Sequence, residues 1–247
     1  MSSAIYPSLK GRKVLITGGG SGIGAGLVAG FLRQDAEVHF IDLADDVSAS
    51  LPASDNQPTF HKCDLTDNPA LDKTMAHILS SGPVHILINN AGNDDRHTLA
   101  EVTPDYFDNR IGVNLRHMLF CAQAVAPGMK ALGGGAIINF GSISWHLGLP
   151  DLVLYETCKA AIEGMTRALA RELGPDNIRV TTIIPGNVKT KRQEKWYTPE
   201  GEAEIVNAQC LSGRIVPDNV ASLAMFLASD DAALCTGHGY WIDAGWR

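Results

Sequence analysis

The sequence predicts an α/β fold built on a doubly wound, parallel, seven-stranded sheet. Short apolar runs alternate with amphipathic stretches of helical period along the whole chain. The apolar runs are nearly continuous in hydrophobicity, which is typical of strands covered by helices on both faces. The first run also leads directly into a glycine-rich turn that opens a helix. The expected strands span residues 13–18, 37–42, 59–64, 84–90, 135–142, 179–185 and 239–244.

The longest helical pattern covers residues 151–173 and ends at Gly174-Pro175, a sequence that stops helices. No internal repeat or low-complexity linker divides the chain, so we expect a single domain over residues 1–247. Residues 187–215 differ from the rest because they are polar and contain no clear strand. We expect this segment to be an insertion that covers the substrate.

Composition excludes several classes of function. The chain has 247 residues, 45% of them hydrophobic, which suffices for one α/β domain with a sizeable core. A net charge of -7 without any basic run argues against nucleic acid as a partner. No signal peptide is recognisable and no window approaches the roughly 20 apolar residues of a membrane span, so we expect a cytoplasmic protein with no membrane partner. The five cysteines are widely spaced without a CxxC pair, and we expect neither a disulfide framework nor a metal site.

The stretch TGGGSGIG, residues 17–24, predicts a dinucleotide site of the Rossmann type. Glycines let the backbone approach a pyrophosphate, and the following helix offers that anion its N–H groups and positive dipole end. The alternative is an ordinary flexible turn. Asp42 ends the second expected strand, where a carboxylate binds ribose hydroxyls and repels a 2′-phosphate, so NAD is favoured over NADP. Asp42 as a helix cap or solvated carboxylate is the competing interpretation. Asp64, at the end of the third strand, is expected near the adenine edge.

Tyr155 and Lys159 are candidates for acid–base chemistry, because residues four apart share one face of a helix. A nearby ammonium stabilises a phenolate and lowers the tyrosine pKa from about 10. The pair is then a plausible general base, although such pairs often reflect only a lysine stem packed on a ring. Ser142 ends a strand thirteen residues earlier, and its hydroxyl is suited to holding a substrate oxygen.

Together these motifs resemble the short-chain dehydrogenase/reductase family. The matching stretches are TGGGSGIG, NNAG (89–92), GVNL with Asn114, Ser142, Tyr155 with Lys159, and PGNVKT (185–190), in the family's order over almost the whole chain. The resemblance implies that Tyr155 is the acid/base, that Ser142 orients the substrate, and that Asn114 holds a water linked to Lys159. The ending departs from the family's usual Asp-Gly-Gly at Ala244, which should alter a turn and leave the chemistry unchanged. The cofactor residues implied are Gly18, Ser21, Gly22, Ile23, Gly24, Asp42, Asp64, Leu65, Asn90, Ala91, Gly92, Tyr155, Lys159, Pro185, Gly186, Val188 and Thr190.

Further stretches, such as AGNDDRH and NFGSISWHLGL, resemble the bacterial members of this family that oxidise aldoses. This implies oxidation of the C1 hydroxyl of a cyclic aldopentose, D-xylose or L-arabinose, to the lactone, with hydride passing to NAD+. It also implies a homotetramer, with the tail Trp246–Arg247 near a neighbour's site. A sugar pocket needs many hydrogen-bonding groups, and polar residues follow the fourth to sixth strands. The expected substrate contacts are Asn93, Ser142, Ser144, His146, Tyr155, Asn187 and Trp196.

Several alternatives stay open from the sequence. His146 is equally well explained as a hydrogen-bonded loop residue, and Trp196 as a cover over apolar surface or an interface. Arg96 and His97 are expected to turn outward or to pair with Asp94 and Asp95. A carbonyl reductase such as a 3-oxoacyl reductase is the alternative enzyme, and Asp42 argues against its preference for NADPH. A non-catalytic NAD-binding sensor is the third hypothesis, and the presence of Tyr155 and Lys159 argues against it.

Overall fold

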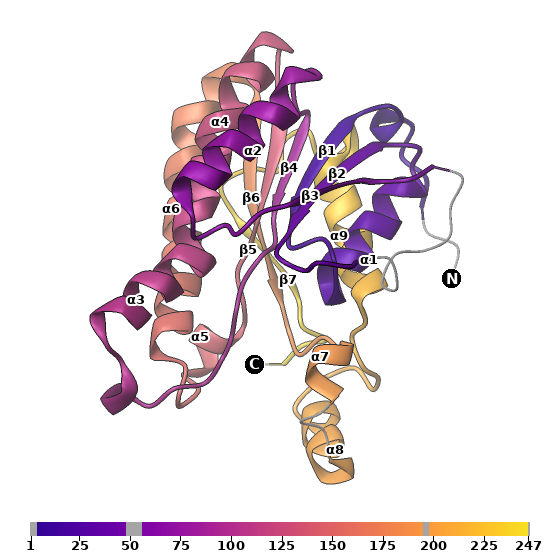
Figure 1. Ribbon diagram of the computed structural model, residues 1–247. Coiled ribbons are helices and arrows are strands. Elements are labelled where there is room, and N and C mark those ends of the chain that lie inside the picture. The colour runs from indigo at the N-terminus through magenta and orange to yellow at the C-terminus, as the bar shows by residue number, and fades with distance from the viewer. Residues whose placement is uncertain (1–3, 48–55, 195–197, 247) are drawn as a thin grey trace.

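The sheet at the centre of the molecule is parallel throughout (Figure 1). The computed structural model describes residues 4–47, 56–194 and 198–246. Within these ranges seven strands are ordered β3-β2-β1-β4-β5-β6-β7, which confirms the predicted doubly wound topology. The strands are β1 (Lys13–Thr17), β2 (Glu37–Asp42), β3 (Thr59–Lys62), β4 (Ile86–Asn89), β5 (Gly135–Phe140), β6 (Ile178–Pro185) and β7 (Gly239–Ile242). Each lies within one or two residues of its expected bounds.

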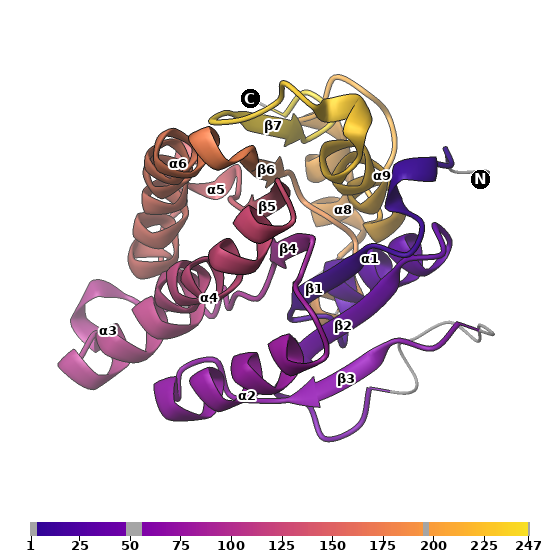
Figure 2. The ribbon, with the colours of Figure 1, turned by 90° about the horizontal axis from the view of Figure 1, so that it is seen from above.

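Helices cover both faces of the sheet (Figure 2). Two pack on one face, namely α1 (Gly22–Leu32) and α9 (Pro217–Ala228). The other face carries α2 (Asn68–Ser80), α4 (His117–Ala131) and α6 (Val153–Leu173). Shorter elements join these layers: α3 (Pro104–Ile111), α5 (Ser144–Leu147), α7 (Lys191–Glu194), α8 (Pro199–Asn207), a π-helical turn η4 (Gly112–Arg116) and the 3₁₀ turns η1 (Pro7–Leu9), η3 (Leu99–Glu101), η5 (Gly174–Asp176) and η6 (Asp230–Ala232). Among the described helices, none is long and apolar enough to cross a bilayer.

Local sequence sets where several of these helices begin. Asp67 accepts a hydrogen bond from the backbone N–H of Ala70 at the start of α2. Thr103 and Thr198 cap α3 and α8 in the same way. Each cap is followed within two residues by a proline, whose missing N–H costs nothing in the first turn of a helix.

The core consists of two apolar layers, one on each face of the sheet. Successive side chains of a strand point to opposite faces, so Val14 and Ile16 of β1 pack toward α1 and α9, whereas Leu15 packs toward α2 and α4. All three are fully buried. Burial on both faces explains why the strands show continuous apolar runs and not alternation.

A buried polar ladder ties α6 to three strands. The Asn89 amide Nδ2 donates to Oδ1 of Asn139 over 2.9 Å, joining β4 to β5. Asn139 Nδ2 in turn donates to Thr166 Oγ1 of α6 over 3.0 Å, and Thr182 Oγ1 of β6 donates to the same oxygen over 2.7 Å. All four side chains are essentially inaccessible to solvent. Because buried polar groups are costly to leave unpaired, the ladder fixes the position of α6 along the sheet.

The order of the strands reverses between β1 and β4, which are neighbours in the sheet but lead to opposite halves. In open parallel sheets a crevice forms outside the carboxyl ends of the strands at such a switch point. The fold therefore places a binding site next to the ends of β1 and β4.

We predict that Thr166→Val lowers the free energy of unfolding by about 2–4 kcal/mol, because it leaves the Asn139 and Thr182 side chains buried without their partner. Urea denaturation monitored by circular dichroism measures the change. Thr157→Val is a matched control on the same helix, since the exposed Thr157 hydroxyl donates only to the carbonyl of Val153. The control should change stability by less than about 0.5 kcal/mol. Equal effects of the two variants would contradict the role given to the ladder.

Candidate functional site

A cleft of about 510 Å³ lies at the carboxyl ends of the strands, where the switch point predicts it. Its walls come mainly from the segments that follow β1 to β6, and from the C-terminal end of the described chain. The structure brings together at this cleft every residue that the sequence assigned to the cofactor: Gly18, Ser21, Gly22, Ile23, Gly24, Asp42, Asp64, Leu65, Asn90, Ala91, Gly92, Tyr155, Lys159, Pro185, Gly186, Val188 and Thr190.

The glycine-rich loop has the geometry of an anion cradle. Gly18 has a φ of +68°, and a Cβ at Gly24 would lie 1.8 Å from the carbonyl oxygen of Gly18. The amide of Asn90 holds the loop by donating to the carbonyls of Thr17 and Gly18. Ser21, the N-cap of α1, makes no side-chain cap. The N–H groups of the first turn of α1 therefore remain available to an anion in the cleft, and the loop fits the pyrophosphate of a dinucleotide.

Asp42 lines the cleft at the end of β2 and is held in place by backbone N–H groups. Its Oδ2 accepts from Gly20 over 2.8 Å and its Oδ1 from Ala44 over 3.1 Å. The carboxylate thus shapes the glycine-rich loop as well as facing the cleft. Asp64 is engaged differently, because its Oδ1 accepts from both the backbone N–H and the hydroxyl of Thr66. Its carboxylate therefore orders its own turn at the cleft wall.

Tyr155, Lys159 and Ser142 meet at the cleft as the sequence predicts. Lys159 Nζ lies 5.2 Å from the centre of the Tyr155 ring and donates to the carbonyl of Phe140 over 2.7 Å. Ser142 is hydrogen-bonded to the Tyr155 side chain and also accepts from the hydroxyl of Ser144 over 2.9 Å. Ser144 itself lines the cleft, as predicted, and its hydroxyl also orients that of Ser142.

The pKa of Tyr155 contradicts one sequence-based expectation. Burial raises this pKa above its ordinary value, and the negative charge of Asp94 raises it further. The hydrogen bond with Ser142 and the positive charge of Arg192 act in the opposite direction. Burial also lowers the pKa of Lys159 to about 8. The lysine is thus largely charged at neutral pH, but the tyrosine pKa is raised and not lowered as the i, i+4 spacing suggested, because desolvation is the largest cause of its shift.

Asn114 is fully buried in the π-helical turn η4. Its Oδ1 accepts from the backbone N–H of Asn93 over 2.8 Å, and its Nδ2 donates to the carbonyl of Asn93 over 3.1 Å. A Cβ built on Gly92 would lie 3.2 Å from Asn114 Oδ1 and 3.5 Å from Lys159 Nζ. Asn114 therefore fixes the loop after β4 directly beside Lys159, a role that its place in the sequence motif did not reveal.

The polar loop Asn93–Asp95 binds an arginine that the sequence analysis missed. Arg192 of α7 lines the cleft, and its NH2 group lies 3.2 Å from Asn93 Oδ1, 3.1 Å from Asp94 Oδ1 and 3.0 Å from Asp95 Oδ1. Arg110 also contacts Asp95, at 3.5 Å. The sequence analysis offered Arg96 and His97 as partners of Asp94 and Asp95. The carboxylates are instead paired with Arg192 and Arg110. The available signal was the presence of several lysine and arginine residues between positions 189 and 195, but the sequence does not say which of these charges meets the loop.

Arg96 and His97 are engaged elsewhere. Arg96 lines the cleft and donates to the carbonyl of Pro150 over 2.9 Å. His97 is buried, where its ring nitrogens contact the Tyr106 hydroxyl and the backbone N–H of Leu154. His97 therefore anchors the loop to the start of α6.

The structure corrects the prediction for His146, which lies outside the lining of the cleft. Its Nε2 is 3.0 Å from the Glu163 carboxylate, and its ring packs against Trp145 and Trp241. The alternative interpretation as a hydrogen-bonded structural residue fits this position. The His146 side chain of α5 is directed toward Glu163 of α6 and away from the cleft.

Of the remaining predicted substrate contacts, Asn187 is found at the cleft and Trp196 is not described by the structure. Asn187 lines the cleft, and its Oδ1 accepts from Arg214 over 2.7 Å. Trp196 lies outside the described residues. Trp246, expected near a neighbour's site, lines the cleft of its own chain.

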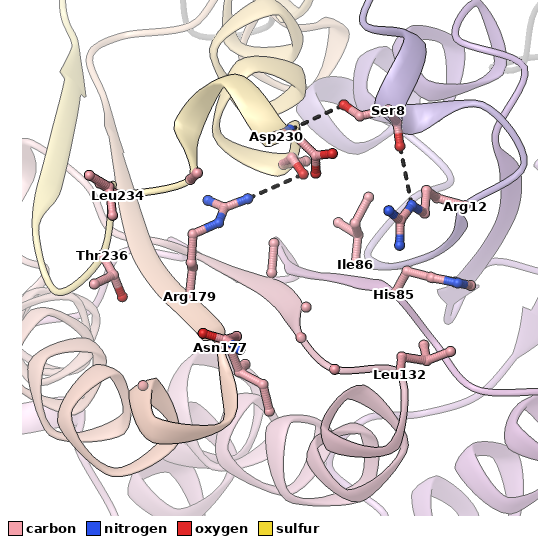
Figure 3. A pocket seen from close by; sticks show the side chains of 18 residues that line it. Ser8, Arg12, His85, Ile86, Leu132, Asn177, Arg179, Asp230, Leu234 and Thr236 are labelled. Atoms are coloured by element: carbon pink, nitrogen blue, oxygen red, sulfur yellow. Dashed lines mark hydrogen bonds between the residues drawn. The ribbon is translucent and has the colours of Figure 1, made fainter.

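A second cavity of about 540 Å³ lies at the opposite edge of the sheet, at the amino ends of β4, β5 and β6 (Figure 3). Its polar groups serve the fold: Arg179 donates to the carbonyls that end α9, and Ser8 bonds Arg12 and Asp230. The described residues that line this second cavity include no tyrosine with a neighbouring lysine, such as the pair Tyr155 and Lys159 in the first cleft. The catalytic chemistry is therefore assigned to the first cleft. No His, Cys, Asp and Glu cluster suited to a metal occurs in the described part of the chain.

Comparisons with known proteins agree with this geometry. A family model described as Enoyl-(Acyl carrier protein) reductase matches residues 18–247. D-xylose 1-dehydrogenase of Caulobacter vibrioides is 72% identical, with 100% of both chains covered. A relative from Rhizobium meliloti described as "Probable galactose dehydrogenase" is 44% identical over 99% of this chain and 98% of its own. The solved structure of 4-hydroxyisoleucine dehydrogenase complexed with NADH has a TM-score of 0.89 at 28% identity, covering 96% of this chain and 98% of that one.

Proposed function

The chain belongs to the short-chain dehydrogenase/reductase family, and on that premise we propose that it oxidises the anomeric C1 hydroxyl of a cyclic aldopentose to the aldonolactone, with hydride transfer to NAD+. As a member of this family it uses a nicotinamide cofactor. The observation that carries the proposal is the meeting of Tyr155, Ser142 and Lys159 in the cleft that also contains the glycine-rich cradle. The substrate class is supported by the full-length similarity to D-xylose 1-dehydrogenase.

In the proposed reaction Tyr155 accepts the proton of the C1 hydroxyl, and the C1–O bond becomes a carbonyl as hydride leaves C1. The bound cofactor supplies the hydride acceptor. Ser142, already hydrogen-bonded to Tyr155, orients the sugar oxygen, and Ser144 holds Ser142 in that orientation. Lys159 contributes a positive charge next to the forming phenolate, and the carbonyl of Phe140 fixes its position.

The polar lining supports a polyhydroxylated substrate. The lining of the cleft includes the polar residues Asn93, Asp94, Asn187, Arg192 and Gln193. Each sugar hydroxyl that a site leaves unpaired costs on the order of 1–3 kcal/mol, so such a wall favours a sugar. An acyl chain would offer these polar groups no hydrogen-bonding partner of its own, which argues against the alternative of a 3-oxoacyl reductase.

NAD over NADP is proposed from the position of Asp42. Its carboxylate faces the cleft at the end of β2, where the first ribose of a dinucleotide is bound in this fold. A negative charge there repels a 2′-phosphate.

We further propose a cytoplasmic homotetramer in which residues 187–215 cover the substrate. Arg192 of that segment reaches across to the loop after β4, which supports the covering role. Exposed apolar side chains on α3, α4 and α6 support an assembly through these helices: Phe107, Leu119, Phe120 and Val153.

The proposed function predicts NADH production, seen as absorbance at about 340 nm, when NAD+ and a panel of aldopentoses and aldohexoses are supplied. Tyr155→Phe should lower kcat by about 10²–10⁴-fold while NAD still binds, because only the proton acceptor is removed. Tyr106→Phe is the matched control, since that hydroxyl contacts His97 away from the cleft. No turnover with any sugar in the panel would refute the function, and an active Tyr155→Phe would refute the assignment of the base.

We predict that Asp42→Asn raises the ratio of kcat/KM for NADP+ over NAD+ by about tenfold or more. Asparagine keeps an oxygen acceptor for the N–H of Gly20, so the loop is retained while the charge is lost. Asp64→Asn removes an equal charge from the same cleft and should leave the ratio within about twofold. An unchanged ratio for Asp42→Asn, or equal shifts in both variants, would contradict the role of Asp42.

The rate of sugar oxidation is expected to rise with pH from about 6 upward. Burial and Asp94 hold the pKa of Tyr155 high, so deprotonation increases the amount of active base over this whole range. Lys159, with a pKa of about 8, loses its charge above that value, and the rise should therefore become shallower there. The profile of kcat/KM against pH measures this, and a flat profile from pH 6 to 10 would contradict it. Asp94→Asn should displace the profile to lower pH.

A further inference from the structure

The C-terminal end of the chain contributes an aromatic wall to the substrate side of the cleft. Figure 1 shows this end below the carboxyl edge of the sheet, between α5 and α7. Both helices contribute to the cleft lining, through Ser144 and Leu147 of α5 and Arg192 of α7, and Trp246 lines it as well. Trp196, which the sequence analysis expected to contact the substrate, lies outside the described residues, and Trp246 is the tryptophan that lines the cleft among those described.

A tight turn after β7 determines where Trp246 points. Gly245 N–H donates to Asp243 Oδ1 over 3.0 Å, and Trp246 N–H donates to the carbonyl of Asp243 over 3.1 Å. Ala244 and Gly245 have φ values of +56° and +80°. The left-handed conformation is unfavourable for alanine, and it is maintained here because the surrounding contacts determine the turn.

The turn is fastened to the segments that frame the substrate side. The carbonyl of Ala244 accepts from the N–H groups of Cys210 and Leu211, at 2.9 and 3.1 Å. A Cβ on Gly186 would lie 2.8 Å from Cα of Asp243, so the turn packs directly on the backbone that precedes Asn187. The backbone that carries Trp246 is thus held in place by this turn.

Three aromatic side chains line the cleft among the described residues: Phe140, Tyr155 and Trp246. Phe140 is only 2% exposed and belongs to the apolar core beneath the sheet's edge. Tyr155 is the proposed base. Trp246 is only partly buried, so its ring has accessible surface, while many of its neighbours in the lining are polar.

We propose that Trp246 is the platform on which the sugar ring stacks, and that it favours aldoses with a flat C–H face. This proposal rests on the proposed function. β-D-Xylopyranose carries all its hydroxyls equatorially and presents C–H groups on both faces, which suits an indole surface. L-Arabinopyranose has an axial C4 hydroxyl, which would be placed against the ring on one face. Trp246 therefore selects for D-xylose over L-arabinose.

The test compares Trp246→Leu, which keeps an apolar side chain but removes the aromatic face, with Trp246→Phe, which keeps a ring. Trp246→Leu should raise KM for D-xylose about tenfold and reduce the preference for D-xylose over L-arabinose by at least about threefold. Trp246→Phe should keep a KM for D-xylose close to that of the wild type and most of the preference for D-xylose over L-arabinose. The Kd for NADH, measured by fluorescence, should stay within about twofold for each variant.

Trp241→Leu is the matched control, because Trp241 lies in β7 of the same chain end but packs against His146 outside the cleft lining. Thermal unfolding verifies that each variant is folded. Two results would overturn the role of Trp246 as a stacking platform while leaving the proposed function standing. One is that Trp246→Leu keeps wild-type kinetics. The other is that Trp246→Leu and Trp246→Phe lose activity equally and both bind NADH more weakly. Failure of the wild type to oxidise any aldose would overturn both.

Discussion

The attachment of α6 to the sheet determines where the chemistry takes place. Thr166 of this helix is bonded to Asn139 and Thr182, and two turns earlier Lys159 donates to the carbonyl of Phe140. Residues seven apart lie on one face of a helix, so a single stripe of α6 carries both anchors. Both are buried, and sliding the helix would leave several polar groups unpaired at once. Tyr155 lies one turn before Lys159 on the same stripe, and its distance from the strand ends follows from these bonds.

The electrostatics of the site make the base dependent on what else is bound. Burial and Asp94 raise the pKa of Tyr155, and Arg192 opposes them only from a half-exposed ion pair. Lys159 keeps its charge near neutral pH although burial lowers its pKa to about 8. A positive charge brought into the cleft lowers the tyrosine pKa, so a larger fraction of Tyr155 is deprotonated and able to accept a proton when the oxidised cofactor is present. The protein therefore links proton removal to the presence of a hydride acceptor.

The sheet, its strand bounds and the cofactor side could be predicted from the sequence, because local patterns encode them. Continuous apolar runs indicate covered strands, and the glycine loop follows directly from β1 in the chain. The substrate side could not be predicted equally well. Arg192 meets Asp94 although they are 98 positions apart in the sequence. Trp246 reaches the cleft through a turn with unusual φ values, and His146 is bonded to Glu163 outside the cleft. The direction of the Tyr155 pKa also depends on burial, which spacing along a helix does not report.

The two sides of the cleft are held by interactions of different strength. The cofactor side rests on partly buried hydrogen bonds from side chains to backbone, such as those of Asn114 and Asn90. The substrate side joins three distant segments through side chains that are roughly half exposed, and such ion pairs contribute only about 0–1 kcal/mol each. Substitutions there change contacts to substrate with little cost to the fold. A protein 28% identical can consequently share this fold at a TM-score of 0.89 while being named for a hydroxylated amino acid. The weakly held segments are where a common scaffold acquires its particular substrate.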